Sequence, residues 1–224
     1  MPTPVQNFAK DLQQDLPGAA LNAPAVQRNK DALLAALAPH LSNRTGNLLE
    51  IGSGTGQHAV HFASKFTGLT YQPTDLHEDH IRSIEAWRQA SEISNLQQAQ
   101  RLDALASDWS TQVAGLAPQS LSALLAINVI HISPWPVTTA IISGASKYLA
   151  EDGLLITYGP YKRNGVHTAE SNAAFDASLK RMDPDFGVRD IADVGAEAER
   201  LGLELAQEIA MPANNLTLVF RRKT

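Results

Sequence analysis

The 224-residue sequence contains no cysteine and no long hydrophobic run. Without cysteine there can be no disulfide bond, thiolate metal site, iron–sulfur cluster or cysteine nucleophile. The most apolar stretch, residues 121–132, is interrupted by Ser122, Asn128 and His131 and is far too short to span a membrane. The N-terminus lacks the basic start and apolar stretch of a signal peptide, so we expect a cytoplasmic protein without a membrane partner.

Charge is also sparse, because only 18% of the residues are charged. The 18 basic and 23 acidic side chains give a net charge of −5, which argues against binding to bulk nucleic acid or to an anionic membrane. A hydrophobic content of 44% is typical of a globular chain, and the length is typical of one domain. These values favour small-molecule chemistry or protein contact, and they carry no signal for an oligomeric state.

Strand-like and helix-like stretches alternate along most of the chain. Apolar runs predict strands at residues 48–51, 69–72, 99–102, 121–127, 154–158, 203–209 and 216–220. Helical spacing and end signals, including Ser133 as a cap before Pro134 and Asp190 as another cap, predict helices at 25–41, 57–66, 77–92, 133–149, 170–182 and 190–201. This order predicts a doubly wound α/β fold with a mostly parallel sheet. The short last turn, 211–215, requires an antiparallel pair, so one strand near an edge is expected to be reversed.

The chain divides into two unequal parts. Residues 1–22 contain three prolines among mixed polar residues and are expected to form a weakly ordered leader. Residues 23–224 are expected to form a single domain. Within it, the polar segment 160–188 is expected to be an inserted cap over a substrate pocket.

A glycine-rich loop follows the first predicted strand. It reads Glu50-Ile51-Gly52-Ser53-Gly54-Thr55-Gly56-Gln57. Glycines allow a sharp turn and a close ligand, and the next helix directs free N–H groups at that ligand. A dinucleotide fingerprint needs glycine at position 57, and a P-loop needs Lys after Gly56, so both patterns fail. An acidic residue followed by three alternate glycines instead resembles the S-adenosylmethionine loop of class I methyltransferases.

Acidic residues also follow the second and third predicted strands. Asp75 lies about 20 residues beyond the loop, the distance at which an acceptor reaches a ribose hydroxyl in related nucleotide folds. Asp103 is placed to accept from an adenine amine. Each residue could instead cap the helix that follows it. The combination with the glycine loop favours the cofactor.

Six segments carry a more specific resemblance. They are Arg28-Asn29-Lys30, residues 51–58, residues 128–135 (Asn-Val-Ile-His-Ile-Ser-Pro-Trp), residues 158–163 (Tyr-Gly-Pro-Tyr-Lys-Arg), residues 170–176 and residues 211–216. Together they resemble a family of small methyltransferase-like proteins of unknown function, whose animal member is called methyltransferase-like protein 26. The resemblance covers about residues 25–222. It implies a Rossmann-like class I methyltransferase fold, seven strands in the order 3-2-1-4-5-7-6 with strand 7 antiparallel, and S-adenosylmethionine as cofactor, without a known acceptor.

The cofactor site is predicted from these segments and from the loops that follow the strands. Its members are Arg28, Asn29, Glu50, Gly52, Ser53, Gly54, Gly56, Gln57, Asp75, Leu76, Asp103 and Asn128. The family resemblance and the fork geometry of arginine suggest that Arg28 pairs with the methionine carboxylate. The product would be S-adenosylhomocysteine.

Methyl transfer mainly requires positioning, and a base is needed only if the acceptor must lose a proton. The catalytic candidates are His131, as a base or an orienting donor, together with Asn128 and Tyr161. His131 could equally be a packed histidine bonded to backbone. Acceptor contacts are predicted from Trp135, Tyr158, Lys162, Asn172 and Asn214. Each of these residues could instead have a structural role. Trp135 could pack in the core, Lys162 could lie in a solvated turn, Asn172 could lie on a solvent-exposed helix face, and Asn214 could serve the geometry of its turn.

Two histidine pairs, His58 with His61 and His77 with His80, have a spacing that can place both rings on one helix face. No third ligand is evident, so no metal site is predicted. The favoured function is an S-adenosylmethionine-dependent methyltransferase that acts on a small-molecule acceptor. The alternatives are a regulatory protein that binds the cofactor without catalysis and, less favoured by the glycine spacing, a nucleotide-dependent oxidoreductase.

Overall fold

The structure is a computed structural model, and it describes residues 18–223. Most of the expected leader, residues 1–17, lies outside the described part. Within the described part, Leu21 is tied to the helix of residues 78–91. Its N–H donates to Ser83 Oγ at 2.8 Å, and its carbonyl accepts from Trp87 Nε1 at 2.8 Å. Residues 21–23 therefore lie against the body of the domain.

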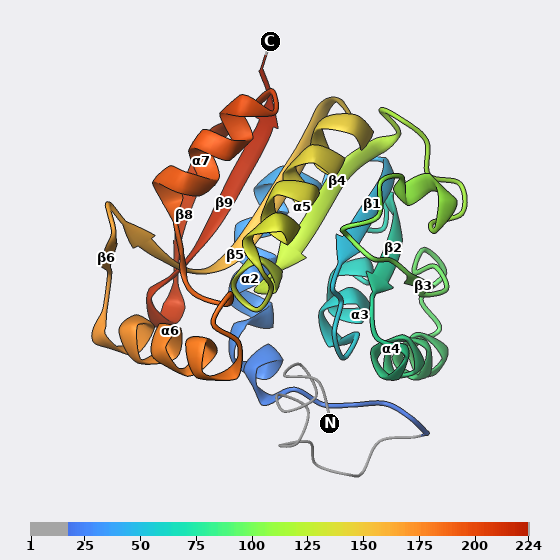
Figure 1. The fold of residues 1–224 in the computed structure, drawn as a ribbon. Coiled ribbons are helices and arrows are strands. Elements are labelled where there is room, and N and C mark those ends of the chain that lie inside the picture. The colour runs from blue at the N-terminus through green and yellow to red at the C-terminus, as the bar shows by residue number, and fades with distance from the viewer. Residues whose placement is uncertain (1–17, 224) are drawn as a thin grey trace.

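A single open sheet organises the chain (Figure 1). Its strands are β1 (Gly46–Ile51), β2 (Leu69–Asp75), β3 (Gln100–Arg101), β4 (Leu121–Ile127), β5 (Leu149–Arg163), β6 (Val166–His167), β7 (Arg189–Asp190), β8 (Leu203–Met211) and β9 (Asn215–Arg222). The main path runs β3-β2-β1-β4-β5-β9-β8, and β9 is antiparallel to both β5 and β8. The predicted strand order and the reversed strand are confirmed. The short strands β6 and β7 were not predicted, and both pair with the end of β5.

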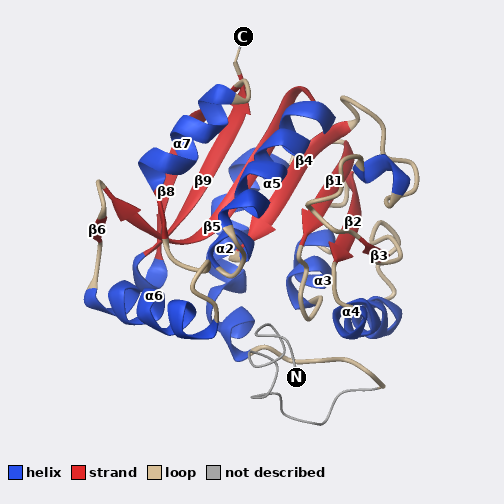
Figure 2. Ribbon diagram, viewed as in Figure 1, coloured by secondary structure: helices blue, strands red, loops and turns tan. Residues whose placement is uncertain are grey.

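Helices flank both faces of the sheet (Figure 2). They are α2 (Pro24–Leu41), α3 (Gln57–Ala63), α4 (Glu78–Ser91), α5 (Trp135–Tyr148), α6 (Glu170–Met182) and α7 (Ile191–Arg200), with the 3-10 turns η1 (Trp109–Thr111), η2 (Val129–His131) and η3 (Pro212–Asn214). Asp190 caps α7 as predicted, since its Oδ1 accepts from the Ala192 N–H. The predicted cap at Ser133 is wrong. The Ser133 hydroxyl donates to the Val129 carbonyl instead, and α5 begins after Pro134.

Two apolar cores hold these layers together. Leu37 of α2 and Phe62 of α3 pack on one face of the sheet, against strand residues such as Leu48. On the other face, Ile141 of α5 and Val194 of α7 pack in a second core with strand residues. Strands β1 to β5 run parallel in this arrangement, so the loops that follow them meet at one edge.

The segment after β5 differs from the rest of the chain. β5 extends past the predicted end at Tyr158 to Arg163, because Tyr158–Tyr161 stays buried and pairs with β9 and β7. Strand β6, helix α6 and strand β7 follow and return the chain to the loop after β4. We call residues 160–190 the cap segment, after the cap predicted at residues 160–188, whose role over a substrate pocket stays a prediction. Among residues 18–223, no helix is both long enough and apolar enough to cross a membrane.

Two helical glycines offer a test of how tightly the helices pack. A Cβ at Gly144 in α5 would overlap the buried indole of Trp109, whereas a Cβ at Gly195 in α7 would meet nothing within 4 Å. Gly144→Ala is expected to lower the free energy of unfolding by about 1–3 kcal/mol through overpacking. Gly195→Ala is expected to raise it by about 0.5–1 kcal/mol, since glycine is a poor helix former. Chemical denaturation measures both values, and shifts of the same sign would contradict the packing argument.

Candidate functional site

The glycine loop between β1 and α3 turns through three left-handed residues. The φ angles are +66° at Gly52, +58° at Gly54 and +88° at Gly56. A side chain at Gly52 would overlap Val129, and one at Gly56 would overlap Ile84 of α4, so both glycines permit close packing. A Cβ at Gly54 would meet nothing within 4 Å. The loop is therefore fixed on both sides and open at its centre, where a ligand can approach the backbone.

Asp75 fixes the open centre of the loop. Its Oδ2 accepts from the Gly54 N–H at 2.9 Å, and its Oδ1 accepts from the His77 N–H at 3.0 Å. The same Oδ1 lies 3.0 Å from His80 Nδ1. The carboxylate predicted to bind a ribose thus lies beside the loop, as expected, and already receives donors from the protein.

Glu50 lies beneath the loop with only 1% of its surface exposed. Its Oε2 accepts from Ser53 Oγ at 2.7 Å. Burial raises the pKa of Glu50 to about 7, against an ordinary value of 4.5, although the contact with Ser53 opposes the shift. Glu50 and Ser53 therefore support the loop from inside, and Glu50 is partly protonated at neutral pH.

Two leucines follow neighbouring strands beside the loop. Leu76 after β2 is 40% exposed, and Leu105 after β3 is 55% exposed. Asp103 lies close to Leu105, because its Oδ1 accepts from the Leu105 N–H at 2.9 Å. The sequence prediction included Leu76 and Asp103 but missed Leu105. The available signal was a leucine, flanked by Ala104 and Ala106, in the loop that follows Asp103.

The remaining cofactor candidates lie where α2 meets α3. Gln57 fastens the N-terminal segment, since its Nε2 donates to Asn22 Oδ1 at 2.7 Å and its Oε1 accepts from the Ala23 N–H at 2.7 Å. Asn29 Oδ1 lies 2.9 Å from His58 Nε2. Arg28 is exposed, and it forms no ion pair among residues 18–223. The structure therefore gives Gln57 a structural contact and leaves the Arg28 guanidinium accessible.

The acceptor candidates lie at the ends of β4 and β5 and at the β8–β9 turn. Asn128 has a left-handed backbone with φ +61°, and its N–H donates to the Tyr158 carbonyl at 2.8 Å. The Tyr158 hydroxyl accepts from Asn215 Nδ2 at 3.0 Å. Burial raises the pKa of Tyr158. Asn128, Tyr158 and Asn215 thus bring three strand ends together.

His131 is fully buried between the sheet and the cap segment. Its Nδ1 accepts from the Arg189 N–H at 3.3 Å, and its ring meets the edge of Tyr161 at 4.9 Å between centroids. A Cβ at Gly159 would overlap the imidazole, so the ring rests directly on the glycine backbone. Burial lowers the pKa of His131 to about 3. This is the arrangement of a packed, neutral histidine rather than of an accessible base.

Tyr161 is also fully buried, and its hydroxyl pairs with Thr157 Oγ1 at 2.8 Å. Burial raises the pKa of Tyr161, so the phenol stays protonated. Its side chain belongs to the core beneath α5 and α7. In this structure the catalytic candidate Tyr161 presents no atom to a ligand.

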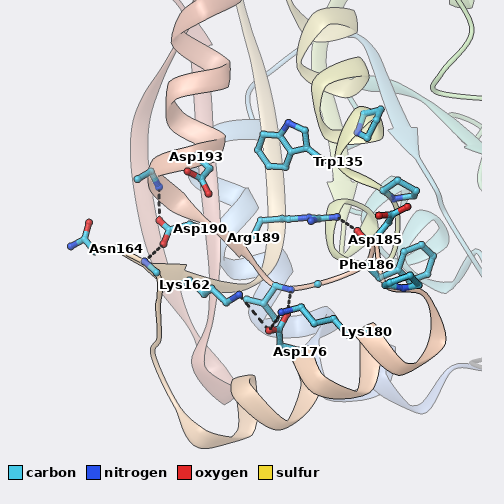
Figure 3. A pocket seen from close by; sticks show the side chains of 17 residues that line it. Trp135, Lys162, Asn164, Asp176, Lys180, Asp185, Phe186, Arg189, Asp190 and Asp193 are labelled. Carbon is cyan, nitrogen blue, oxygen red and sulfur yellow. Dashed lines mark hydrogen bonds and ion pairs between the residues drawn. The ribbon is translucent and has the colours of Figure 1, made fainter.

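A buried carboxylate holds the cap segment together (Figure 3). Asp176 Oδ1 accepts from the Val188 N–H at 2.7 Å, and Oδ2 accepts from Lys180 Nζ at 2.9 Å. Lys162 Nζ lies 3.4 Å from the same oxygen, and His167 Nε2 lies 3.3 Å from it. Burial opposes ionisation of Asp176, but these donors outweigh it and lower its pKa. Lys162, a predicted acceptor contact, is thus paired within the cap.

The cap segment and the starts of α5 and α7 together line an open groove of about 910 Å³, and Trp135 and Lys162 contribute to this lining. Trp135 packs beneath the guanidinium of Arg189, 5.8 Å from the ring centroid. Asn172 lies elsewhere, because its Nδ2 donates to the Asn214 carbonyl at 2.9 Å and ties α6 to the β8–β9 turn. Asn214 itself is exposed, with φ +58°, in that turn. The five predicted acceptor contacts therefore fall into three places: the groove, the contact between α6 and the β8–β9 turn, and the contact of Tyr158 with Asn128.

No group of three or more His, Asp or Glu side chains within residues 18–223 is arranged to hold a metal ion. His77 and His80 do meet edge to face, at 5.5 Å between ring centroids. His80 contacts Asp75, as described above. The pair therefore belongs to the support of the glycine loop.

Several solved structures that share this fold are named as methyltransferases. The mitomycin 7-O-methyltransferase MmcR matches with a TM-score of 0.71 and 14% identity, over 90% of this chain and 55% of that one. An O-methyltransferase family protein from Burkholderia thailandensis matches with a TM-score of 0.72 and 14% identity, over 89% and 58%. Human N-acetylserotonin methyltransferase, solved in complex with S-adenosylmethionine, matches with a TM-score of 0.68 and 12% identity, over 89% and 53%. The chain spans little more than half the length of these proteins.

The fold is therefore the Rossmann-like α/β fold of methyltransferases, with a mostly parallel sheet and one reversed strand. The family described as "Protein of unknown function (DUF938)" matches residues 21–222, nearly the whole chain. The chain belongs to this family.

The raised pKa of Glu50 predicts a specific dependence of stability on pH. Its ionised form is disfavoured in the fold, so the native protein loses stability as the pH rises from the ordinary value of 4.5 through about 7. Glu50→Gln removes this penalty and keeps an acceptor for Ser53. Between pH 5 and pH 8, the stability of the variant relative to the native protein should improve by roughly 2 kcal/mol.

Denaturant unfolding at a series of pH values measures this difference. Glu151→Gln, at an exposed position near the start of β5, is the matched control and should show a constant difference from the native protein. A constant difference for Glu50→Gln as well would contradict the proposed protonation.

Proposed function

We propose that this protein is an S-adenosylmethionine-dependent methyltransferase that acts on a small molecule. The observation that carries the proposal is the open backbone at Gly54, framed by packed glycines at 52 and 56 and lying at the boundary between β1 and β4. Ligands of open α/β sheets bind at this boundary, where the strand order reverses. The methyltransferase fold and the earlier resemblance to the family of methyltransferase-like protein 26 support the choice of cofactor.

The cofactor would supply an electrophilic methyl group on a sulfonium. Gly54 allows the methionine portion to approach the loop, and the accessible guanidinium of Arg28 is suited to its carboxylate. Asp75 and Asp103 stand at adjacent strand ends for the ribose and adenine. Leu76 and Leu105 expose apolar surface that an adenine ring would cover. These residues fit the cofactor without rearrangement of the sheet.

The acceptor is assigned to the region of Asn128, Tyr158 and Asn215, where three strand ends meet. Because the net charge is −5 and the site is built from neutral groups, we favour a small molecule over nucleic acid. A second candidate is a regulatory protein that binds the cofactor without catalysis. It is favoured by one observation, the complete burial of His131 and Tyr161.

Cofactor binding can be tested with two matched glycines. Gly54 and Gly115 both have a left-handed backbone and open space at the Cβ position, so an alanine strains both to a similar degree. Gly54→Ala is expected to weaken binding of S-adenosylmethionine at least tenfold, since the methyl group occupies the approach to the loop. Gly115→Ala should bind as the native protein does. Isothermal titration calorimetry with S-adenosylmethionine, S-adenosylhomocysteine and NAD gives the affinities.

Tight binding of NAD alone would favour a nucleotide-dependent oxidoreductase over a methyltransferase. Equal affinities of the two alanine variants for S-adenosylmethionine would show that the glycine loop does not contact the cofactor. Binding without transfer of a labelled methyl group to any component of a metabolite extract would favour the regulatory protein.

A further inference from the structure

The residues just before α2 are tied to the glycine loop by two short chains of hydrogen bonds. In the first chain, the Leu21 N–H donates to Ser83 Oγ at 2.8 Å, and the Ser83 hydroxyl donates to the Thr55 carbonyl at 2.7 Å. Ser83 has no exposed surface, so water does not compete for these bonds. Because Thr55 lies between Gly54 and Gly56, this chain reaches the centre of the loop.

Gln57 forms the second chain. Its Oε1 accepts from the Thr55 hydroxyl at 3.0 Å and from the Ala23 N–H at 2.7 Å. Its Nε2 donates to Asn22 Oδ1 at 2.7 Å. The residue is 7% exposed, and both lone pairs of Oε1 are occupied, so this oxygen has no capacity left for a ligand. The side chain of Gln57 instead joins residues 22–23 to Thr55.

Helix α2 begins at Pro24, directly after these bonded residues. Its Asn29 contacts two other parts of the predicted site. Asn29 Oδ1 lies 2.9 Å from His58 Nε2 in α3, and the Asn29 side chain also contacts the Tyr158 hydroxyl in β5. The first turns of α2 therefore extend from the glycine loop toward the acceptor end.

The strand order separates these contacts from the adenosine end of the predicted site. In the order β3-β2-β1-β4-β5, strands β2 and β3 lie on one side of β1, and β4 and β5 lie on the other. Asp75 at the end of β2 and Asp103 after β3 therefore lie on the side of β1 opposite to β5. Within the described part of the chain, neither carboxylate bonds to Gln57 or to residues 21–23. A cofactor that extends from β3 toward β5 thus meets Thr55 and α2 with its methionine portion.

We infer that Gln57 is a positioning residue for the methionine portion of the cofactor. By binding both Thr55 and residues 22–23, it holds the open backbone at Gly54 and the first turns of α2, which carry Arg28, in one fixed arrangement. The inference rests on the proposed methyltransferase function, which assigns Gly54 and Arg28 to that portion of the cofactor. Groups that are already held in place bind more tightly, because less conformational freedom is lost when the ligand arrives.

Calorimetry with two ligands tests the inference. S-adenosylhomocysteine carries the amino-acid portion, whereas 5′-methylthioadenosine keeps the adenosine and the sulfur but lacks that portion. Gln57→Ala is expected to weaken binding of S-adenosylhomocysteine at least about tenfold and to change the affinity for 5′-methylthioadenosine by less than about twofold. The matched control is Gln27→Ala. Gln27 is an exposed residue of α2 whose side chain makes no hydrogen bond to the described residues, so both affinities should stay unchanged.

A merely structural role for Gln57 would weaken the binding of both ligands by the same factor, and that result would overturn the inference. An unchanged affinity for S-adenosylhomocysteine would overturn it as well. Thermal transitions check that each variant is folded. If Gln57→Ala does not fold, Asn22→Ala decides, because it removes only the bond from Gln57 Nε2. This milder variant should show the same selective loss to a smaller extent, and equal losses for both ligands would again contradict the positioning role.

Failure of the proposed function gives a different result. A native protein that binds neither S-adenosylmethionine nor S-adenosylhomocysteine refutes the methyltransferase itself. A native protein that binds S-adenosylhomocysteine, with no selective loss in Gln57→Ala, keeps the cofactor site and refutes only the role of Gln57.

Discussion

The ring of His131 occupies the place that a side chain at position 159 would take, and the acceptor end of the molecule depends on this close approach. It lets the loop after β4 lie directly against the end of β5. The Arg189 N–H then reaches His131 Nδ1, and the Gly187 N–H reaches the His131 carbonyl. Through these two bonds, the cap segment closes over the strand ends. The His131 ring also makes a T-shaped contact with Tyr161, which belongs to the core beneath α5 and α7.

The same contact divides the site into two chemically different halves. On the cofactor side, the loop is held at Gly52 and Gly56 but open at Gly54, so a ligand finds free space beside the backbone. On the acceptor side, the close packing that attaches the cap also encloses the aromatic and imidazole groups. The attachment of the cap segment and the burial of His131 and Tyr161 are thus two results of one packing constraint.

Local signals in the sequence were enough for most of the fold. The apolar runs predict the strands, and the short turn before β9 predicts the reversed pair, while the strand order was implied by the family resemblance. Helix α6 and the Asp190 cap appear where the pattern predicts them. Contacts between distant segments were beyond such signals. From its place in the sequence, Gln57 was predicted to bind the cofactor. In the structure its side chain is hydrogen-bonded to Asn22 and Ala23. His131 follows a strand end as a catalytic residue would, and only the distant glycine at 159 shows why it is packed instead.

The charge of the site is also hard to predict from the sequence alone, because it depends on burial. Counted along the sequence, Glu50, Asp75 and Asp103 make the site acidic, which favours a cationic cofactor and disfavours a large anionic acceptor. The structure changes that sum. Burial leaves Glu50 partly protonated near pH 7, and Asp75 accepts from two backbone N–H groups. The negative charge that Glu50 contributes beside the glycine loop is therefore smaller than the sequence suggests.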